Sequence, residues 1–178
     1  MALSDIYDYF RSYDKRSFAV FAQQGSEPTD VDVDAFEQTI GFDLPDEFRE
    51  FAVHPLGGLY MEVHEDLWPR PQLYAVGPFW SFLYGLQVYS LSPGAPDWLQ
   101  IEHAWNEMAD QGYPRLVPFL KIIGNADPYC FTERRTIVIW RHEEPDNPEP
   151  VARTFSECVM AEIRELETRK NRKVAGEI

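Results

Sequence analysis

Catalysis or metal binding in this 178-residue chain would depend first on its four histidines and two cysteines. The histidines are His54, His64, His103 and His142, and no two of them have the spacing of a helical metal site such as H-E-x-x-H. Glu62 and His64 are two residues apart and would share one face of a strand, where they could hold a metal ion. Polar residues on the solvent face of a strand explain the same spacing, so we expect no metal site.

The two cysteines, Cys130 and Cys158, are too few for a disulfide framework and lack the spacing of a metal-binding motif. Cys130 lies in an apolar run that is typical of a buried strand, where a thiol has little reactivity. His142 and Glu143 resemble an acid–base pair, but charged residues are expected wherever a strand runs into a proline-rich loop. The chain also lacks a glycine-rich phosphate loop and a G-x-S-x-G nucleophile elbow. We therefore expect no catalytic residues and no cofactor, and we predict that the chain is not an enzyme.

The net charge of −14 favours some partners over others. Residues 1–66 contain 15 acidic and 4 basic side chains, whereas RKNRK at 169–173 is the only basic cluster. Binding to phosphates needs clustered lysine and arginine, so nucleic acid is an unsuitable ligand. A basic protein partner fits the charge because opposite fields speed and orient encounter. Solubility alone explains an acidic surface equally well.

The compartment is predicted from what the chain lacks. No run approaches the roughly 18 apolar residues that a membrane span requires. The N-terminal residues MALSDIYDYF have neither the basic nor the apolar region of a signal peptide. We expect a cytoplasmic protein with reduced cysteines, bound to no membrane.

The first third of the chain predicts short helices. Residues 1–30 are expected to form an N-terminal helical extension that ends in the linker QQGSEPTD. Asp34 and Glu37 match a capping box, which predicts a helix that ends at Gly41, and the alternating Asp–Val run before it is expected to be extended. Pro45 suits the start of a second helix. This pair of predicted helices presents acidic residues rather than side chains that read DNA bases. The aspartates before the first helix lack the mid-loop glycine of a calcium-binding loop.

The remaining sequence predicts strands between two further helices. Aromatic and β-branched runs cut by glycine and proline predict strands at 59–63, 73–76, 80–91, 116–123, 128–132 and 136–140. Capping boxes formed by Asp97 with Gln100, and by Thr154 with Glu157, predict the two helices. The acidic stretch EEPDNPEP at 143–150 is expected to be an exposed loop. Helices at both ends of a run of strands predict a single α+β domain.

Four motifs in this order resemble the SUKH superfamily, which includes the fungal Smi/Knr regulators and many bacterial proteins. The motifs are G-x-x-L-P-x-x-[FY] (Gly41, Leu44, Pro45, Phe48), a double glycine (Gly57, Gly58), G-x-x-D-x-Y-C-F (Gly124, Asp127, Tyr129, Cys130, Phe131) and T-F-x-E (Thr154, Phe155, Glu157). The resemblance covers about residues 31–166. The chain departs from the family at Leu56, where asparagine is usual, and at Thr132, where aspartate is usual.

The resemblance implies a mostly antiparallel sheet of about six strands with helices packed around it. The SUKH-like domain would span residues 31–168 and be followed by a basic tail at 169–178. The resemblance also implies binding rather than catalysis: bacterial members look like cytoplasmic immunity proteins that neutralise a cognate toxin, often a nuclease. Two alternatives stay open, namely an intracellular scaffold or regulator of the Smi/Knr type with residues 1–30 as a docking arm, and an undetected enzyme or metal protein. The oligomeric state is not predicted.

Candidate partner-binding residues come from three parts of the chain. Asp127 and Tyr129 lie in the segment characteristic of the family. Trp80 and Tyr84 are aromatic residues four positions apart and are expected on one sheet face. Glu143, Glu144 and Asp146 would form an acidic rim. Core packing of the aromatics and solvation of the acidic loop are the alternative explanations.

Overall fold

The computed structural model describes residues 2–23, 25–71 and 78–178. The elements in chain order are α1 (Leu3–Ser12), β1 (Phe18–Phe21), α2 (Asp30–Ile40), α3 (Asp46–Ala52), β2 (Tyr60–Val63), η1 (Phe79–Phe82), β3 (Gly85–Val88), η2 (Asp97–Leu99), α4 (Ile101–Asp110), β4 (Leu116–Ile122), β5 (Tyr129–Thr132), β6 (Ile137–Ile139), β7 (Glu149–Val151) and α5 (Phe155–Val174). The η elements are short 3-10 helices.

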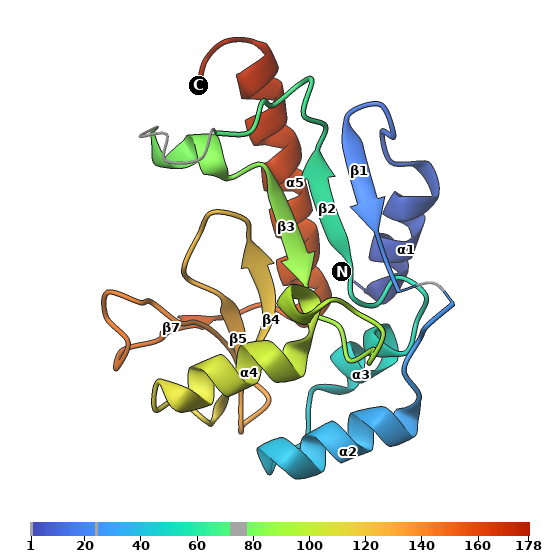
Figure 1. Cartoon of the computed structure of the whole chain (residues 1–178), viewed down its shortest axis with the longest axis vertical. Coiled ribbons are helices and arrows are strands. Elements are labelled where there is room, and N and C mark those ends of the chain that lie inside the picture. The colour runs from blue at the N-terminus through green and yellow to red at the C-terminus, as the bar shows by residue number, and fades with distance from the viewer. Residues whose placement is uncertain (1, 24, 72–77) are drawn as a thin grey trace.

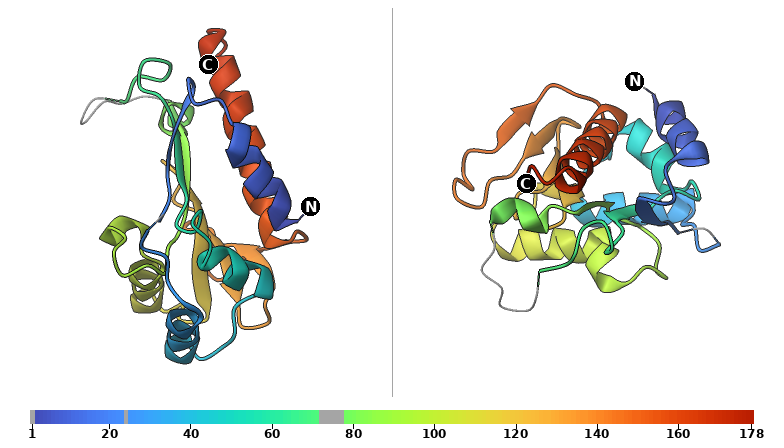
Figure 2. Two further views of the ribbon diagram at one scale, coloured as in Figure 1. Left: turned by 90° about the vertical axis from the view of Figure 1, so that its right-hand side faces the viewer. Right: turned by 90° about the horizontal axis from the view of Figure 1, so that it is seen from above.

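One sheet organises the molecule. Its seven strands lie in chain order from β1 to β7, and each pairs antiparallel with the next. Helix α5 covers one face with α1 beside it, whereas α4 lies against the other face (Figures 1 and 2). The predicted α+β single domain is confirmed, with one strand more than the six expected. Among the described residues, no helix combines the length and the apolar composition needed to cross a membrane.

The main core contains buried residues of the sheet and of all five α-helices. Successive strand residues alternate between the two faces, so Met61 and Val63 are buried under α5 while Tyr60 and Glu62 face the other way. Four phenylalanines join α3, the sheet and α5: the Phe119 and Phe131 rings stack at 4.0 Å, and Phe48 and Phe155 pack on them. A second, smaller cluster between α4 and the sheet consists of Met108, Cys130, Val138 and Trp140.

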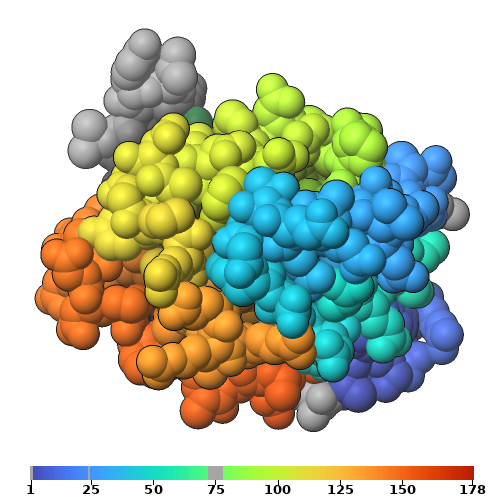
Figure 3. Space-filling model, turned by 90° about the horizontal axis from the view of Figure 1, so that it is seen from below, coloured from blue at the N-terminus to red at the C-terminus, as the bar shows by residue number. Residues whose placement is uncertain are grey.

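Helices α2 and α3 close the lower end of the molecule. Seen from below, α2 and its connection to α3 lie between α4 and the β5–β6 hairpin (Figure 3). Arg135 of that hairpin contacts Asp43 at 2.7 Å and Asp46 at 3.5 Å. The Phe36 ring of α2 meets Trp105 of α4 edge-on at 6.3 Å.

The N-terminal residues differ most from the expectation. Strand β1 falls where an extension and linker were predicted, and it pairs with β2 from Phe18↔Val63 to Phe21↔Tyr60. Leu3, Ile6 and Phe10 of α1 are buried in the main core. The helical extension and linker predicted for residues 1–30 was therefore wrong at β1, because four residues give too short a pattern to recognise without their pairing partner. The domain boundary expected near residue 30 stays a prediction.

Helix α2 begins four residues before the predicted capping box. Thr29 is the N-cap, and its backbone N–H and hydroxyl both donate to Asp32 at 2.7 Å. The Asp–Val run is therefore helical and not extended, because burial of Val33 and Phe36 at i, i+3 spacing outweighs the β-propensity of valine. Gly41 ends the helix at φ 83°, as predicted.

Other helix and strand boundaries also differ from those predicted. The strand expected at 80–91 is reduced to β3, because residues 79–82 form the 3-10 helix η1, and the strand expected at 73–76 lies outside the described residues. Gln100 is the N-cap of α4, whereas Asp97 opens η2. The loop expected at 143–150 contains the start of β7, an edge strand in which Pro150 is tolerated. The tail expected from residue 169 is helical to Val174.

The double glycine gives Gln23 room to connect three parts of the chain. The Gln23 side chain donates to the Ala52 and His54 carbonyls at the end of α3 and accepts from the Ser90 hydroxyl at 2.7 Å. A Cβ on Gly57 would lie 2.3 Å from Gln23 Nε2, and one on Gly58 would lie 2.6 Å from Ser90 Cβ. The close approach of these segments therefore requires both glycines.

Gly58→Ala should destabilise the chain by about 2–4 kcal/mol, because the new methyl group meets Ser90 and because φ is +63° there. Gly41→Ala is the matched control, since Gly41 also has positive φ but nothing within 4 Å of a built Cβ. It should lose only about 1–2 kcal/mol. Equilibrium denaturation in urea measures the free energy of unfolding of both variants. Equal losses would contradict the prediction, because they would show that the Gln23–Ser90 contact can move aside without loss of stability.

Candidate functional site

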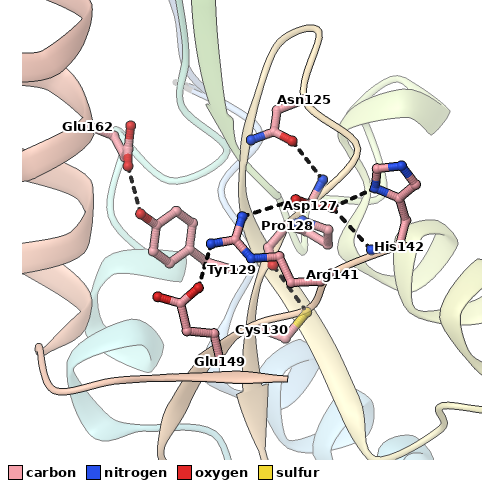
Figure 4. A network of polar contacts seen from close by, with 9 residues as sticks. All are labelled: Asn125, Asp127, Pro128, Tyr129, Cys130, Arg141, His142, Glu149 and Glu162. Carbon is pink, nitrogen blue, oxygen red and sulfur yellow. Dashed lines mark hydrogen bonds and ion pairs between the residues drawn. The ribbon is translucent and has the colours of Figure 1, made fainter. Parts of the chain in front are cut away.

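Asp127 lies in the turn that leads from β4 into β5 and is held there by three neighbours (Figure 4). Its backbone N–H donates to Asn125 Oδ1 at 3.0 Å. One carboxylate oxygen lies 3.1 Å from the backbone nitrogen and 2.7 Å from the ring Nδ1 of His142, and the other accepts from Arg141 Nη1 at 3.1 Å. The side chain is only 13% exposed, so this carboxylate connects β5 to the end of β6.

The electrostatics of Asp127 follow from these contacts. Burial raises the pKa of its carboxyl, but the hydrogen bonds from His142 and Arg141 outweigh burial and lower the pKa below the ordinary value of 3.8. The carboxylate is therefore ionised at neutral pH. Arg141 also contacts Glu149 of β7, so one guanidinium holds two carboxylates, one from the β4–β5 turn and one from β7.

A hollow of about 500 Å³ opens beside this network. It is lined by Asp127, Arg141, Glu143, Glu144, Asn147, Pro148, Glu149 and Pro150. Four carboxylates thus face one guanidinium. Arg141 contacts Asp127 and Glu149, whereas no ion pair among the described residues involves Glu143 or Glu144. These two exposed carboxylates give the hollow its excess negative charge.

Three of the seven predicted binding residues, Asp127, Glu143 and Glu144, meet in this hollow. Asp146 lies on the same loop but outside the lining, and it accepts a hydrogen bond from the Tyr113 hydroxyl at 3.1 Å. Tyr129 points the other way, into the layer below α5, where its hydroxyl donates to Glu162 at 2.6 Å (Figure 4). Burial and the Glu162 carboxylate raise the pKa of Tyr129.

Trp80 and Tyr84 are separate from the hollow. Trp80 belongs to η1 and is 48% exposed, so the prediction that both residues lie on one sheet face was wrong. Tyr84 precedes β3, and the Arg70 guanidinium covers its ring at 3.9 Å. Pro78 starts a 3-10 turn in which a four-residue spacing no longer means a shared strand face.

Sequence reasoning missed two members of the site, Arg141 and Glu149. Arg141 lies just before the proline-rich stretch expected to be a loop at 143–150, Glu149 lies inside it, and no spacing rule relates them. They meet because β7 pairs with β6, with Glu149 opposite Ile139. The signal that the sequence offered was Arg141 directly after the strand predicted at 136–140.

The carboxylates of the hollow suit binding of a positively charged group of a partner better than catalysis. His142 and Asp127 form an imidazole–carboxylate pair, but the residues lining the hollow include no serine, threonine or cysteine to act as a nucleophile.

Cys130 is fully buried, with its thiol 3.8 Å from the Pro128 carbonyl. In the described parts of the chain, no three His, Cys, Asp or Glu residues converge as metal ligands. His64 contacts the Lys15 carbonyl at 3.1 Å, while Glu62 pairs with Arg70 at 3.0 Å.

Fold and site together describe a one-sheet α+β protein with an acidic hollow at one sheet edge. A family model described as SMI1 / KNR4 family (SUKH-1) matches residues 27–160, which is most of the chain. The chain therefore belongs to this family, and the resemblance seen in the four motifs is confirmed. A search of curated proteins finds no match.

Asp127→Asn should destabilise the chain by about 1–3 kcal/mol at pH 7, because the charged hydrogen bonds from His142 and Arg141 are weakened. The folded-state pKa of Asp127 is lowered, so its stabilisation is present above the ordinary pKa of 3.8 and is lost as the pH falls through the folded-state pKa. Urea denaturation of both proteins at pH 7 and at pH 3 should show the difference shrinking in acid. Glu144→Gln, which removes an exposed carboxylate, is the control and should change stability by less than about 0.5 kcal/mol.

Both thiols should be inert in the native protein. Burial raises the pKa of Cys158 to about 12 and raises the pKa of Cys130 as well. At pH 8 roughly one Cys158 thiol in ten thousand is then a thiolate, the reactive form. Titration with a chromogenic disulfide should detect two thiols in denaturant and none within minutes in buffer. A fast-reacting native thiol would restore the enzyme alternative.

Proposed function

We propose that this chain is a non-enzymatic immunity protein that binds and neutralises a basic toxin domain, of the nuclease type, in the cytoplasm. The observation that carries the proposal is the acidic hollow, in which four carboxylates surround Arg141. Membership of the SMI1 / KNR4 family supports this proposal, since the resemblance implies binding rather than catalysis and an immunity role for bacterial members.

The charge of the hollow matches what a nuclease must present. A protein that acts on nucleic acid needs lysine and arginine where the phosphates lie, and an acidic blocker competes for the same side chains. One ion pair at 4 Å contributes about 1 kcal/mol in water and about 4 kcal/mol near a protein surface of lower effective dielectric, before desolvation is subtracted. The benefit is therefore greatest for orientation and association rate.

The hollow is also held in place before a partner arrives. Asp127 is immobilised by His142 and Arg141, and Pro148 and Pro150 stiffen the part of the lining at β7. Arg141 compensates the two carboxylates nearest to it, so the negative charge left for a partner lies on the exposed Glu143 and Glu144. A preorganised acidic surface binds with less entropic cost than a mobile acidic loop.

The alternative is an intracellular scaffold or regulator that uses residues 1–30 as a docking arm. Strand β1 and the buried side chains of α1 contribute to the sheet and core, so a detachable arm receives no support from the fold. Deleting residues 1–30 would remove a strand and would not discriminate between the two functions.

The double variant Glu143→Lys/Glu144→Lys should weaken binding to the toxin domain encoded beside the gene of this chain at least tenfold, which is about 1.4 kcal/mol. Charge reversal in the hollow replaces attraction to a basic surface with repulsion. The association rate, measured by surface plasmon resonance at 50 mM and 300 mM salt, should fall most at low salt. Growth protection on co-expression should be lost in parallel.

The matched control is Glu102→Lys/Asp110→Lys, which makes the same change in net charge on the exposed face of α4. It should alter affinity less than about threefold, because neither residue lines the hollow and charges outside the contact are screened. Equal weakening by both variants would assign binding to overall charge. Failure of the unmodified chain to protect cells would overturn the proposed function.

A further inference from the structure

The two outer strands of the sheet are protected against further pairing to different degrees. β7 contains Glu149 and Pro150, a charge and an imino acid that resist the addition of another strand. β1, with the sequence Phe-Ala-Val-Phe at Phe18–Phe21, contains no charged residue and no proline. Its last residue, Phe21, is 66% exposed. An apolar edge strand of this kind is a ready partner for an extended segment.

The backbone of β1 presents hydrogen-bonding groups to the outside. His64 N–H donates to the Ser17 carbonyl at 2.9 Å, so in the observed register Ala19 and Phe21 form the bonded pairs with β2. The N–H and carbonyl of Val20 consequently point away from β2, toward the outer edge. The left view of Figure 2 looks at this edge, and there α1 lies beside β1 in the helical layer rather than over it.

An apolar pocket of about 600 Å³ adjoins the same edge on the sheet face opposite α5. Its aromatic wall is a row of three rings, in which Tyr60 meets Phe21 at 6.3 Å and Trp98 at 5.2 Å. Trp98 is 53% exposed although it is one of the largest apolar side chains. Gln23 and Ser90 contribute polar groups to the lining. The pocket is far more apolar than the acidic hollow and belongs to other strands.

We propose that β1 and this pocket bind an extended segment of the basic partner, which adds to the sheet as an eighth strand with apolar side chains in the pocket. The inference rests on the proposed function for the identity of the partner. In strand addition, main-chain hydrogen bonds provide affinity and a pocket for alternate side chains provides specificity. The Val20 backbone would supply the main-chain hydrogen bonds, and the wall of Phe21, Tyr60 and Trp98 would supply the pocket.

Charge selects a basic partner over a second copy of this chain. Residues 1–66, which contain β1, carry 15 acidic and 4 basic side chains within a chain of net charge −14. Pairing two copies through β1 would bring their most acidic thirds together, whereas a basic segment gains from the same field.

The test uses a defined probe, a capped ten-residue peptide in which lysine alternates with valine and phenylalanine, and the full-length ¹⁵N-labelled chain. Addition of the peptide should shift the Val20 amide and Trp98 indole resonances and slow hydrogen exchange at Val20. Val20→Pro removes the outward N–H without removing a bond to β2, and Trp98→Ala shortens the exposed pocket wall. Each should weaken peptide binding at least tenfold, whereas Val20→Thr, which keeps the amide and the β-branched shape, should bind normally.

A peptide of the same composition with N-methyl groups at alternate residues is the matched control and should lose binding, since only its backbone donors have changed. Shifts confined to the acidic hollow, or unchanged affinity in both Val20→Pro and Trp98→Ala, would overturn the inference. A dimer of the free chain in sedimentation velocity that Val20→Pro dissociates would also overturn it, by assigning the edge to a second copy.

Failure of this inference and failure of the proposed function are distinguishable. Loss of toxin protection in the Glu143→Lys/Glu144→Lys variant, together with no response at β1, leaves the proposed function standing and removes the eighth strand. If the peptide binds at β1 but the chain protects against no toxin, the eighth strand stands and the proposed function falls. The edge of β1 would then bind another basic protein.

Discussion

Stacking of Phe119 on Phe131 at 4.0 Å is the contact on which the rest of this structure depends. The two rings come from neighbouring strands, and Phe48 of α3 and Phe155 of α5 close on them from the helical side. Aromatic pairs contribute about 0.5–1.5 kcal/mol beyond the burial of their area, and each ring here is almost fully buried. Two consecutive strands and two helices from distant parts of the chain are thereby held in one arrangement.

This cluster also positions the acidic hollow. With Phe131 held toward α5, the alternation of β5 places Tyr129 on the same side and Cys130 against α4. Asp127, two residues before Tyr129, then lies at the end of the sheet, where it meets Arg141 and His142 after β6. The site is thus built from side chains whose backbones are fixed by a core on the other side of the strand. Such support keeps charged groups in place.

The molecule presents two unlike surfaces at opposite edges of one sheet. The hollow beside β7 offers charge, which acts over about 10 Å and guides an approaching partner. The edge of β1 offers hydrogen-bonding backbone and aromatic area, which act only on contact and slow dissociation. A partner that used both would find the chain quickly and leave it slowly, as neutralisation of a toxin requires.

The sequence by itself determined the features that arise within a few residues. Gly41 ends α2, the Thr154–Glu157 capping box opens α5, and the apolar spacing of the helices predicted an α+β domain, because caps and helical faces depend on neighbours in the chain. Tertiary structure alone decided the rest. Gln23 was assigned to a linker and lies buried between the end of α3 and Ser90, while Arg141 and Glu149 meet because β7, a strand that contains a proline, pairs with β6. These contacts join segments that no periodicity relates, and they form only once the aromatic core has brought the strands into register.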